Sequence, residues 1–266
     1  MFSDKTNYSG WQIRSTQPVR FLRHGATTVA WKALGFVAAF GLALFVGGQS
    51  ARAEILWSTP PGSTTGGGSV DAQAGFTLSA NAVTITLTNL EQNLGNVAQE
   101  ISGLLFDVTD ATGNGALATS NSGLISYIDT GNGGTYTAGV SDLLSRWTAT
   151  ESGLTITLTT LGGGPPDRLI IGPDDHDGFN PNIGKYAAAN SSINTHNPNV
   201  LGTATFALTV PGVTSSSSID HVVFLFGSVP GSNEVPGVPE PSTLVLLGIG
   251  TIGLVAYAWR RRKRAT

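Results

Sequence analysis

The sequence contains no cysteine, and only 12% of its 266 residues are charged. The lack of cysteine excludes disulfides, cysteine-ligated zinc, iron–sulfur clusters and thiol nucleophiles. Neither the G-x-S-x-G motif nor the H-E-x-x-H motif occurs, so two common hydrolase signatures are missing. The interior of the chain also lacks a helical hydrophobic period of useful length, which argues against a helical domain.

Basic residues are almost missing between Glu54 and Val238. Only Arg146, Arg168 and Lys185 are basic there, against fifteen acidic residues, which gives this stretch a formal charge of −12. A surface of this charge repels polyanions, so nucleic acid is excluded as a partner. The other eleven basic residues lie at the two ends of the chain, where membrane topology explains them.

The N-terminal end has the organisation of a secretory signal. A basic region ends at Lys32, an apolar run covers residues 33–46, and Ala51 and Ala53 then form an A-x-A cleavage site. The apolar run is short for a bilayer span but suits the hydrophobic region of a signal peptide. We therefore predict that residues 1–53 are a signal peptide. An uncleaved anchor helix is the alternative.

The C-terminal end has three parts in a fixed order. Residues 229–243 form a linker that contains a Pro-Glu-Pro motif, residues 244–259 are apolar, and residues 260–266 form a basic tail. As a helix, the apolar part would span roughly 24 Å, somewhat less than a hydrocarbon core of about 30 Å. The motif is Pro239, Glu240 and Pro241, and the basic cluster is Arg260, Arg261, Arg262, Lys263 and Arg264. These residues predict a transmembrane helix with a cytoplasmic tail and an extended Pro-Glu-Pro segment outside.

This three-part order resembles the PEP-CTERM sorting signal. The resemblance implies that exosortase, a membrane-embedded cysteine enzyme, recognises the tail and removes the helix. The protein would be anchored in the inner membrane before processing and would then reach the cell surface or the extracellular matrix. Residues 196–214 and 222–227 also resemble a segment of exosortase-dependent surface proteins of uncharacterised activity. A plain tail anchor with a proline-rich stalk is the alternative.

Alternation of apolar and polar residues dominates the middle of the chain. Residues 83–88 and 154–159 alternate apolar residues with threonine, and residues 203–210 place apolar side chains on one face. More continuous apolar runs predict strands at 101–108, 168–171 and 222–226, with a further strand near 124–128. We predict an all-β fold, an antiparallel sandwich or jelly roll over residues 76–228. The glycine- and serine-rich residues 54–75 are predicted to be a flexible leader.

The best candidate for a ligand site lies in a long segment without periodicity, residues 172–199. Carboxylate and amide oxygens clustered in a loop suit calcium, and the candidate ligands are Asp174, Asp175, Asp177 and Asn180. An EF-hand is excluded, because Pro173 and Gly184 would occupy its two terminal ligand positions. A solvated acidic loop is the alternative. No other cofactor is expected.

The remaining polar residues form no catalytic motif. Beyond residue 53, the histidines are His176, His196 and His221, and none belongs to a hydrolase signature. We therefore expect an exported, non-catalytic surface or matrix protein, with extracellular polysaccharide as a candidate ligand. A secreted hydrolase, or a glycan- or calcium-binding module, is the alternative, because paired carboxylates can meet only in the folded chain.

Overall fold

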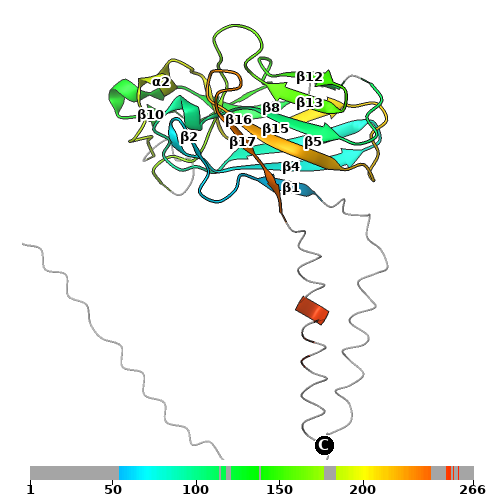
Figure 1. The fold of residues 1–266 in the computed structure, drawn as a ribbon. Coiled ribbons are helices and arrows are strands. Elements are labelled where there is room, and N and C mark those ends of the chain that lie inside the picture. The colour runs from blue at the N-terminus through cyan, green and yellow to red at the C-terminus, as the bar shows by residue number, and fades with distance from the viewer. Residues whose placement is uncertain are drawn as a thin grey trace, which may run out of the picture. The chain divides into compact units, whose positions relative to one another are not determined.

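The fold is that of a computed structural model (Figure 1). It describes residues 54–113, 115–117, 121–137, 139–176 and 184–240, together with residues 250–252, 254 and 257, which are helical. The predicted signal peptide 1–53 and the basic cluster 260–264 therefore lie outside the described residues, as does most of the predicted helix 244–259. Among the described residues, no helix is long and apolar enough to cross a membrane.

The described domain is mostly β, as predicted, and fourteen of its strands form one sheet. One arm of this sheet has the order β8-β15-β5-β4-β1-β18, with β7 on β15 and β11 on β8. All of these neighbours are antiparallel. The strands of this arm are β1 (Ile55–Ser58), β4 (Ala72–Ser79), β5 (Ala82–Asn89), β7 (Ala116–Leu117), β8 (Ser122–Ser126), β11 (Val140–Asp142), β15 (Asn199–Thr209) and β18 (Val238–Pro239).

The second arm has the order β12-β13-β6-β16-β17, again with antiparallel neighbours. Its strands are β6 (Ile101–Val108), β12 (Thr148–Ser152), β13 (Thr155–Thr159), β16 (Ile219–Phe226) and β17 (Glu234–Pro236). Strand β14 (Ile170–Ile171) joins the two arms, because it pairs with β6 on one side and with β15 on the other. The β14–β15 pair is parallel, so the sheet is mixed rather than wholly antiparallel.

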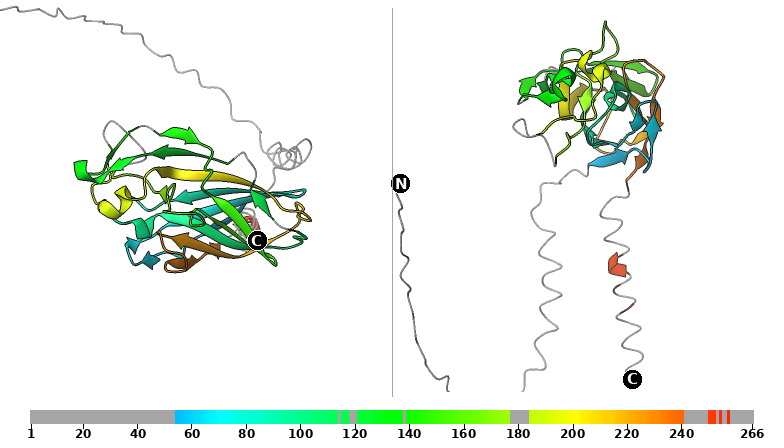
Figure 2. Two further views of the ribbon diagram at one scale, coloured as in Figure 1. Left: turned by 90° about the horizontal axis from the view of Figure 1, so that it is seen from above. Right: turned by 90° about the vertical axis from the view of Figure 1, so that its left-hand side faces the viewer.

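The two arms face each other across a shared apolar core. Phe76 of β4 and Phe106 of β6 make an edge-to-face contact with ring centroids 5.1 Å apart, and Trp147 packs on Phe206 of β15 at 4.7 Å. Figure 2 shows the strands arranged around this common interior. Burial of such side chains stabilises the fold by about 1.5–3 kcal/mol each relative to exposure.

The alternating segments form strands because each has one apolar face. In β5, Val83, Ile85 and Leu87 are fully buried, whereas the threonines between them are partly or fully exposed. Strand β6 is buried along most of its length because β13, β14 and β16 flank it, which matches its continuous apolar run. The predicted strands at 83–88, 101–108, 154–159, 203–210 and 222–226 are all confirmed, within a few residues at their ends.

A second, smaller core lies at one end of the domain. The small sheets β2–β3 and β9–β10 and three short helices lie outside the main sheet, and β9, β10 and α2 contribute side chains to this core. Tyr136 and Tyr186 pack against each other in this core, with ring centroids 5.6 Å apart. These elements are β2 (Thr64–Thr65), β3 (Gly68–Ser69), β9 (Ile128–Asp129), β10 (Thr135–Tyr136), η2 (Val97–Gln99), η3 (Thr130–Asn132) and α2 (Ser191–Asn194).

Two segments differ from the sequence-based prediction. The predicted flexible leader 54–75 contains β1, the β2–β3 hairpin and the start of β4, and Val70, Ala72 and Ala74 are buried in the core. The predicted linker 229–243 contains β17 and β18, which pair with β16 and β1. Both segments are rich in glycine, serine or proline, and their order comes from pairing with distant strands, which composition alone does not reveal.

Candidate functional site

The Pro-Glu-Pro motif begins within the last strand of the domain, at Pro239 of β18. Strand β17 pairs with β16, and two residues later β18 pairs with β1, so the chain passes from one arm of the sheet to the other. Gly237 lies at the crossing point and donates its N–H to the carbonyl of Val222 at 2.8 Å. A Cβ atom at this position would lie 3.1 Å from Phe224 Cε2 and 3.5 Å from Trp57 Cε3. The close approach favours glycine at the crossing.

Strand β18 continues the sheet at its edge. Trp57 is opposite Pro239, and Ser58 is opposite Val238. The backbone N–H of Glu240 donates to the carbonyl of Leu56 at 2.9 Å, which extends the pairing to the middle residue of the motif. Pro239 has no N–H to donate, which fits its place on an edge strand. Figure 1 shows β1, in blue, beside the orange end of the domain.

The Glu240 side chain also returns to the domain. One carboxylate oxygen, Oε1, accepts a hydrogen bond from Gln73 Nε2 at 2.9 Å and another from the Ser58 hydroxyl. Gln73 is on β4 and Ser58 is on β1, so the two strands that precede β18 in the sheet order both contact the motif. Glu240 itself remains exposed. The described residues of the motif, Pro239 and Glu240, therefore continue an extended strand and lie against the sheet.

The other predicted processing residues fall outside the described part of the chain. These are Pro241, the cleavage-site residues Ala51 and Ala53, and the basic cluster Arg260, Arg261, Arg262, Lys263 and Arg264. Their predicted roles therefore stay predictions.

The predicted calcium ligands are described only in part, because Asp177 and Asn180 lie outside the described residues. Asp174 is fully buried, and its Oδ2 accepts a hydrogen bond from the Tyr136 hydroxyl at 2.8 Å. Its Oδ1 accepts the N–H of His176 at 2.9 Å. These bonds give Asp174 a structural role, since they tie the loop to the second core.

Asp175 lies beside Asp174 with different partners. Its Oδ1 accepts the backbone N–H of Lys185 at 3.0 Å and lies 2.7 Å from His176 Nδ1. The Lys185 N–H, and after it the His176 ring, lower the pKa of Asp175. One ligand atom each from Asp174, Asp175 and His176 lies within 4.8 Å of the others, which is close enough to share an ion. The hydrogen bonds explain the same arrangement without one, so calcium binding stays a prediction.

The three histidines do not form a hydrolase triad with the described residues. His221 Nδ1 lies 2.8 Å from Asp107 Oδ2, and Asp107 Oδ1 accepts the Thr155 hydroxyl at 2.5 Å. The Thr155 bond, with a smaller contribution from His221, lowers the pKa of Asp107. In a triad the hydroxyl would contact the histidine and not the carboxylate. The His221 side chain is also 80% exposed, which offers a reaction no shelter from water.

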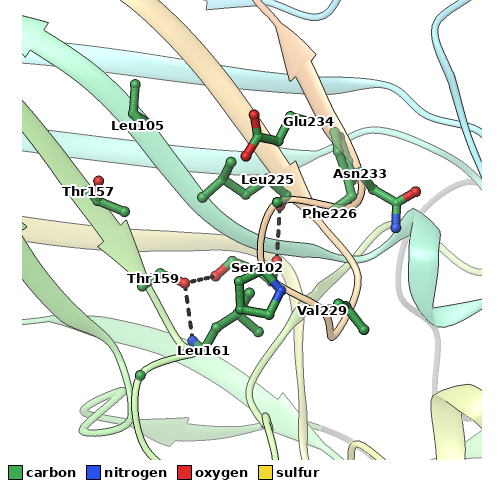
Figure 3. A pocket seen from close by; sticks show the side chains of 13 residues that line it. Ser102, Leu105, Thr157, Thr159, Leu161, Leu225, Phe226, Val229, Asn233 and Glu234 are labelled. Carbon is green, nitrogen blue, oxygen red and sulfur yellow. Dashed lines mark hydrogen bonds between the residues drawn. The ribbon is translucent and has the colours of Figure 1, made fainter.

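The most apolar of the described cavities, about 280 Å³ in volume, lies between β6, β13 and the segment that joins β16 to β17 (Figure 3). Leu105, Leu161 and Leu225 provide much of its apolar wall. Two of its polar groups bond to the backbone: Thr159 donates to the Ser102 carbonyl at 3.0 Å, and the Ser102 hydroxyl donates to the Leu225 carbonyl at 3.3 Å. Thr157, Asn233 and Glu234 also line the cavity. Sugar recognition commonly uses an exposed aromatic platform beside polar groups, and the aromatic residue that lines this cavity, Phe226, is 1% exposed.

Sequence analysis missed Glu100, which lies between η2 and β6. Its side chain is fully buried, and neither carboxylate oxygen has a hydrogen-bond partner among the described residues. Burial raises the pKa of Glu100 well above its usual range. The available signal was its position, directly before the more continuously apolar run 101–108, for which a strand was predicted.

A mostly β domain whose last strand runs into a Pro-Glu-Pro motif, followed in the sequence by an apolar stretch and a basic cluster, has the organisation of an exported protein with a C-terminal sorting signal. The family model of the PEP-CTERM protein-sorting motif matches residues 237–263. The chain therefore carries a PEP-CTERM sorting motif, which implies recognition by an exosortase-type processing enzyme. Comparison with curated proteins and with solved structures gives no match.

Proposed function

We propose that this protein is a non-catalytic surface or extracellular-matrix protein, delivered through its PEP-CTERM motif and released from the membrane by an exosortase-type enzyme. The observation that carries the proposal is the match of the sorting motif to residues 237–263, which begins within the folded domain and includes Glu240. The β domain is the part of the protein that is delivered, and the C-terminal sorting motif directs its delivery. Export and sorting follow from the motif, whereas the role of the β domain is an inference.

The polar chemistry of the domain supports a non-catalytic role. His221 pairs with an aspartate that is itself held by Thr155, and Asp174 is held by Tyr136. In both cases the hydrogen bonds to the described partners explain the position of the carboxylate, and no catalytic role is needed to explain it. The alternative of a secreted hydrolase would require a nucleophile or a carboxylate pair in a sheltered cleft. The apolar cavity beneath the β16–β17 connection has one lining carboxylate, Glu234, and its Ser102 and Thr159 hydroxyls donate to backbone carbonyl groups.

The finer parts of the proposal concern the ends and the architecture. Two facing arms around one core fit a sandwich or jelly-roll arrangement. Residues 1–53 would direct export and be removed after Ala53. Residues 244–259 would cross the inner membrane only until processing, with Arg260–Arg264 retained in the cytoplasm. Extracellular polysaccharide is the ligand class proposed for the mature domain.

Replacement of the motif glutamate tests the proposal. Glu240→Ala leaves the apolar segment and the basic cluster unchanged, so insertion should be normal. In a host with an exosortase, the variant should accumulate as the longer form in the membrane fraction, whereas the wild type loses residues 244–259. Intact-mass measurement of both fractions reads the result directly.

A matched control is Glu234→Ala, which removes an exposed carboxylate from β17, six residues before Glu240. It should be processed like the wild type. Retention of residues 244–259 by the wild type, or equal processing of Glu240→Ala, would leave a plain tail anchor as the better explanation.

A further inference from the structure

The edge of the sheet formed by β1 and β4 contacts the sorting motif through three groups. The Leu56 carbonyl accepts the Glu240 N–H, and Ser58 and Gln73 donate to the Glu240 carboxylate. Backbone pairing between β1 and β18 adds to these contacts. This set of groups recognises both the extended backbone and the negative charge of residue 240.

A processing enzyme that binds the motif in an extended form would use the backbone N–H and the carboxylate of Glu240. Enzymes that cleave a peptide segment commonly bind it in an extended form, through backbone hydrogen bonds and side-chain pockets. While the Glu240 N–H is bonded to Leu56 and its carboxylate to Ser58 and Gln73, those groups are already satisfied. The domain edge and the enzyme therefore cannot engage Glu240 in full at the same time.

The docking is also short enough to be reversible. Strand β18 contains two residues, one of which is a proline without an N–H. Glu240 and both residues of β18 are exposed, so each hydrogen bond at this edge competes with water and contributes little net stability. Segments with few buried apolar contacts open locally without unfolding the rest of a domain.

We infer that the β1–β4 edge is an intramolecular binding site for the sorting motif, and that β18 must leave this edge before the processing enzyme can recognise Glu240. The inference rests on the proposed function in one respect: the step that docking delays is recognition of the motif by an exosortase-type enzyme. The binding site itself is a property of the domain. Its ligand is the segment Val238–Glu240 of the same chain.

Amide exchange in the full-length protein in detergent tests the binding site. A peptide covering residues 236–240 has backbone N–H groups only at Gly237, Val238 and Glu240, because residues 236 and 239 are prolines. In the double variant Ser58→Ala/Gln73→Ala, exchange at Glu240 should accelerate roughly three- to tenfold, as expected for the loss of two exposed hydrogen bonds. Gly237, which donates to Val222 of β16, should keep its protection.

The matched control is Gln92→Ala, which removes an exposed glutamine whose amide bonds to the His176 carbonyl, in a loop outside the β1–β18 contacts. It should leave exchange at Glu240 unchanged. A Glu240 amide that exchanges in the wild type as fast as in the double variant would overturn the inference.

A reversible lock tests the competition. The chain has no cysteine, so Ser58→Cys/Val238→Cys introduces one defined pair at directly opposed positions, where cross-strand Cα distances of about 4.5–5.5 Å suit a disulfide. In an exosortase-bearing host, disulfide-bonded molecules should remain in the longer form. The two single variants cannot form the bond, so they should be processed at least as fast as the wild type. Reducing gels of a pulse–chase experiment show this by size.

The outcomes separate the two proposals. If disulfide-bonded molecules lose residues 244–259 as fast as the single variants, docking does not hinder recognition and the inference is wrong. If the wild type is never processed, the proposed function fails, and the exchange of the Glu240 amide still decides whether the edge binds the motif. Faster processing of Ser58→Ala/Gln73→Ala, with protection lost at Glu240, would support both.

Discussion

At the scale of single residues, the second core depends on a bond between a buried acid and a tyrosine. Asp174 is fully buried, and Tyr136 donates to it at 2.8 Å. Tyr136→Phe keeps the ring and its packing on Tyr186 but removes this donor. Since a buried carboxylate that loses a partner retains its desolvation cost, the free energy of unfolding should fall by about 1–3 kcal/mol.

Urea denaturation of the full-length protein in detergent measures this loss. Tyr127→Phe is the control, because Tyr127 is 65% exposed and its change should alter the free energy of unfolding by less than about 0.5 kcal/mol. Equal midpoints for the two variants would show that the Tyr136 hydroxyl does not stabilise Asp174.

Glu100 makes the stability of the domain depend on pH. Its burial raises the pKa in the folded state above that of the unfolded chain, so the folded state holds the proton to higher pH. Stability from this group is complete below the unfolded pKa, about 4.3, and is lost as pH rises through the folded pKa. Glu100→Gln cannot ionise, so its free energy of unfolding relative to that of the wild type should increase from pH 4.5 to pH 7.5.

The measurement is a pair of urea titrations at the two pH values for each protein. The exposed Glu234→Gln provides the control and should follow the wild type at both. A difference between Glu100→Gln and the wild type that does not change with pH would mean that Glu100 does not titrate abnormally.

At this scale, features that depend on the order of neighbouring residues could be predicted from the sequence. Features that depend on burial or on contacts between distant residues could not. The Pro-Glu-Pro motif could be read directly, because its prolines fix an extended backbone wherever they occur. Its contacts with Ser58 and Gln73 could not, since those residues are more than 160 positions away. Glu100 was missed for the same reason, because burial is a property of the assembled sheet.

At the scale of elements, strand periodicity was a reliable guide for the central strands. Strand β6 has the predicted bounds, residues 101–108, and β13 begins one residue later than predicted. Strand β15 begins four residues earlier than predicted, because Asn199–Gly202 are all buried and show no alternation. The parallel pairing of β14 with β15 has no sequence signature, since a two-residue strand is too short for a pattern.

The edge elements were mispredicted because their order is imposed by partners. In the glycine-rich segment, a Cβ atom on Gly67 would lie 3.0 Å from both Asn96 and Ala98, so the β2–β3 hairpin packs closely on η2. Gln99 of η2 donates to the Ser69 carbonyl at 2.8 Å. Glycine and serine here permit close packing, whereas composition alone suggested flexibility.

At the scale of the whole molecule, the fold pairs the first strand of the described domain with its last strand. Strand β1 begins at Ile55, two residues after the predicted cleavage site, and pairs with β18 just before the Pro-Glu-Pro motif is complete. The carbonyl of Leu56, on β1, accepts the N–H of Glu240. Any loss of β1 would therefore remove the partner of the sorting motif as well as an edge strand of the sheet.

This connection predicts a mature N-terminus at Glu54. Cleavage after Ala53 leaves β1 whole, and it leaves the Glu54 side chain over Gly75, where a Cβ atom would lie 2.8 Å from Glu54 Cδ. Cleavage two or more residues later would remove the pairing of Ile55 with Phe76. N-terminal sequencing and intact mass of the exported protein should give a chain that starts at Glu54.

Ala53→Leu, which places a large residue at the small-residue position of the cleavage site, should accumulate the precursor. Recovery of residues before 47 from the wild type would contradict the prediction by indicating an uncleaved anchor. A start within β1 would also contradict it, because the sheet edge would then not be preserved in the exported protein.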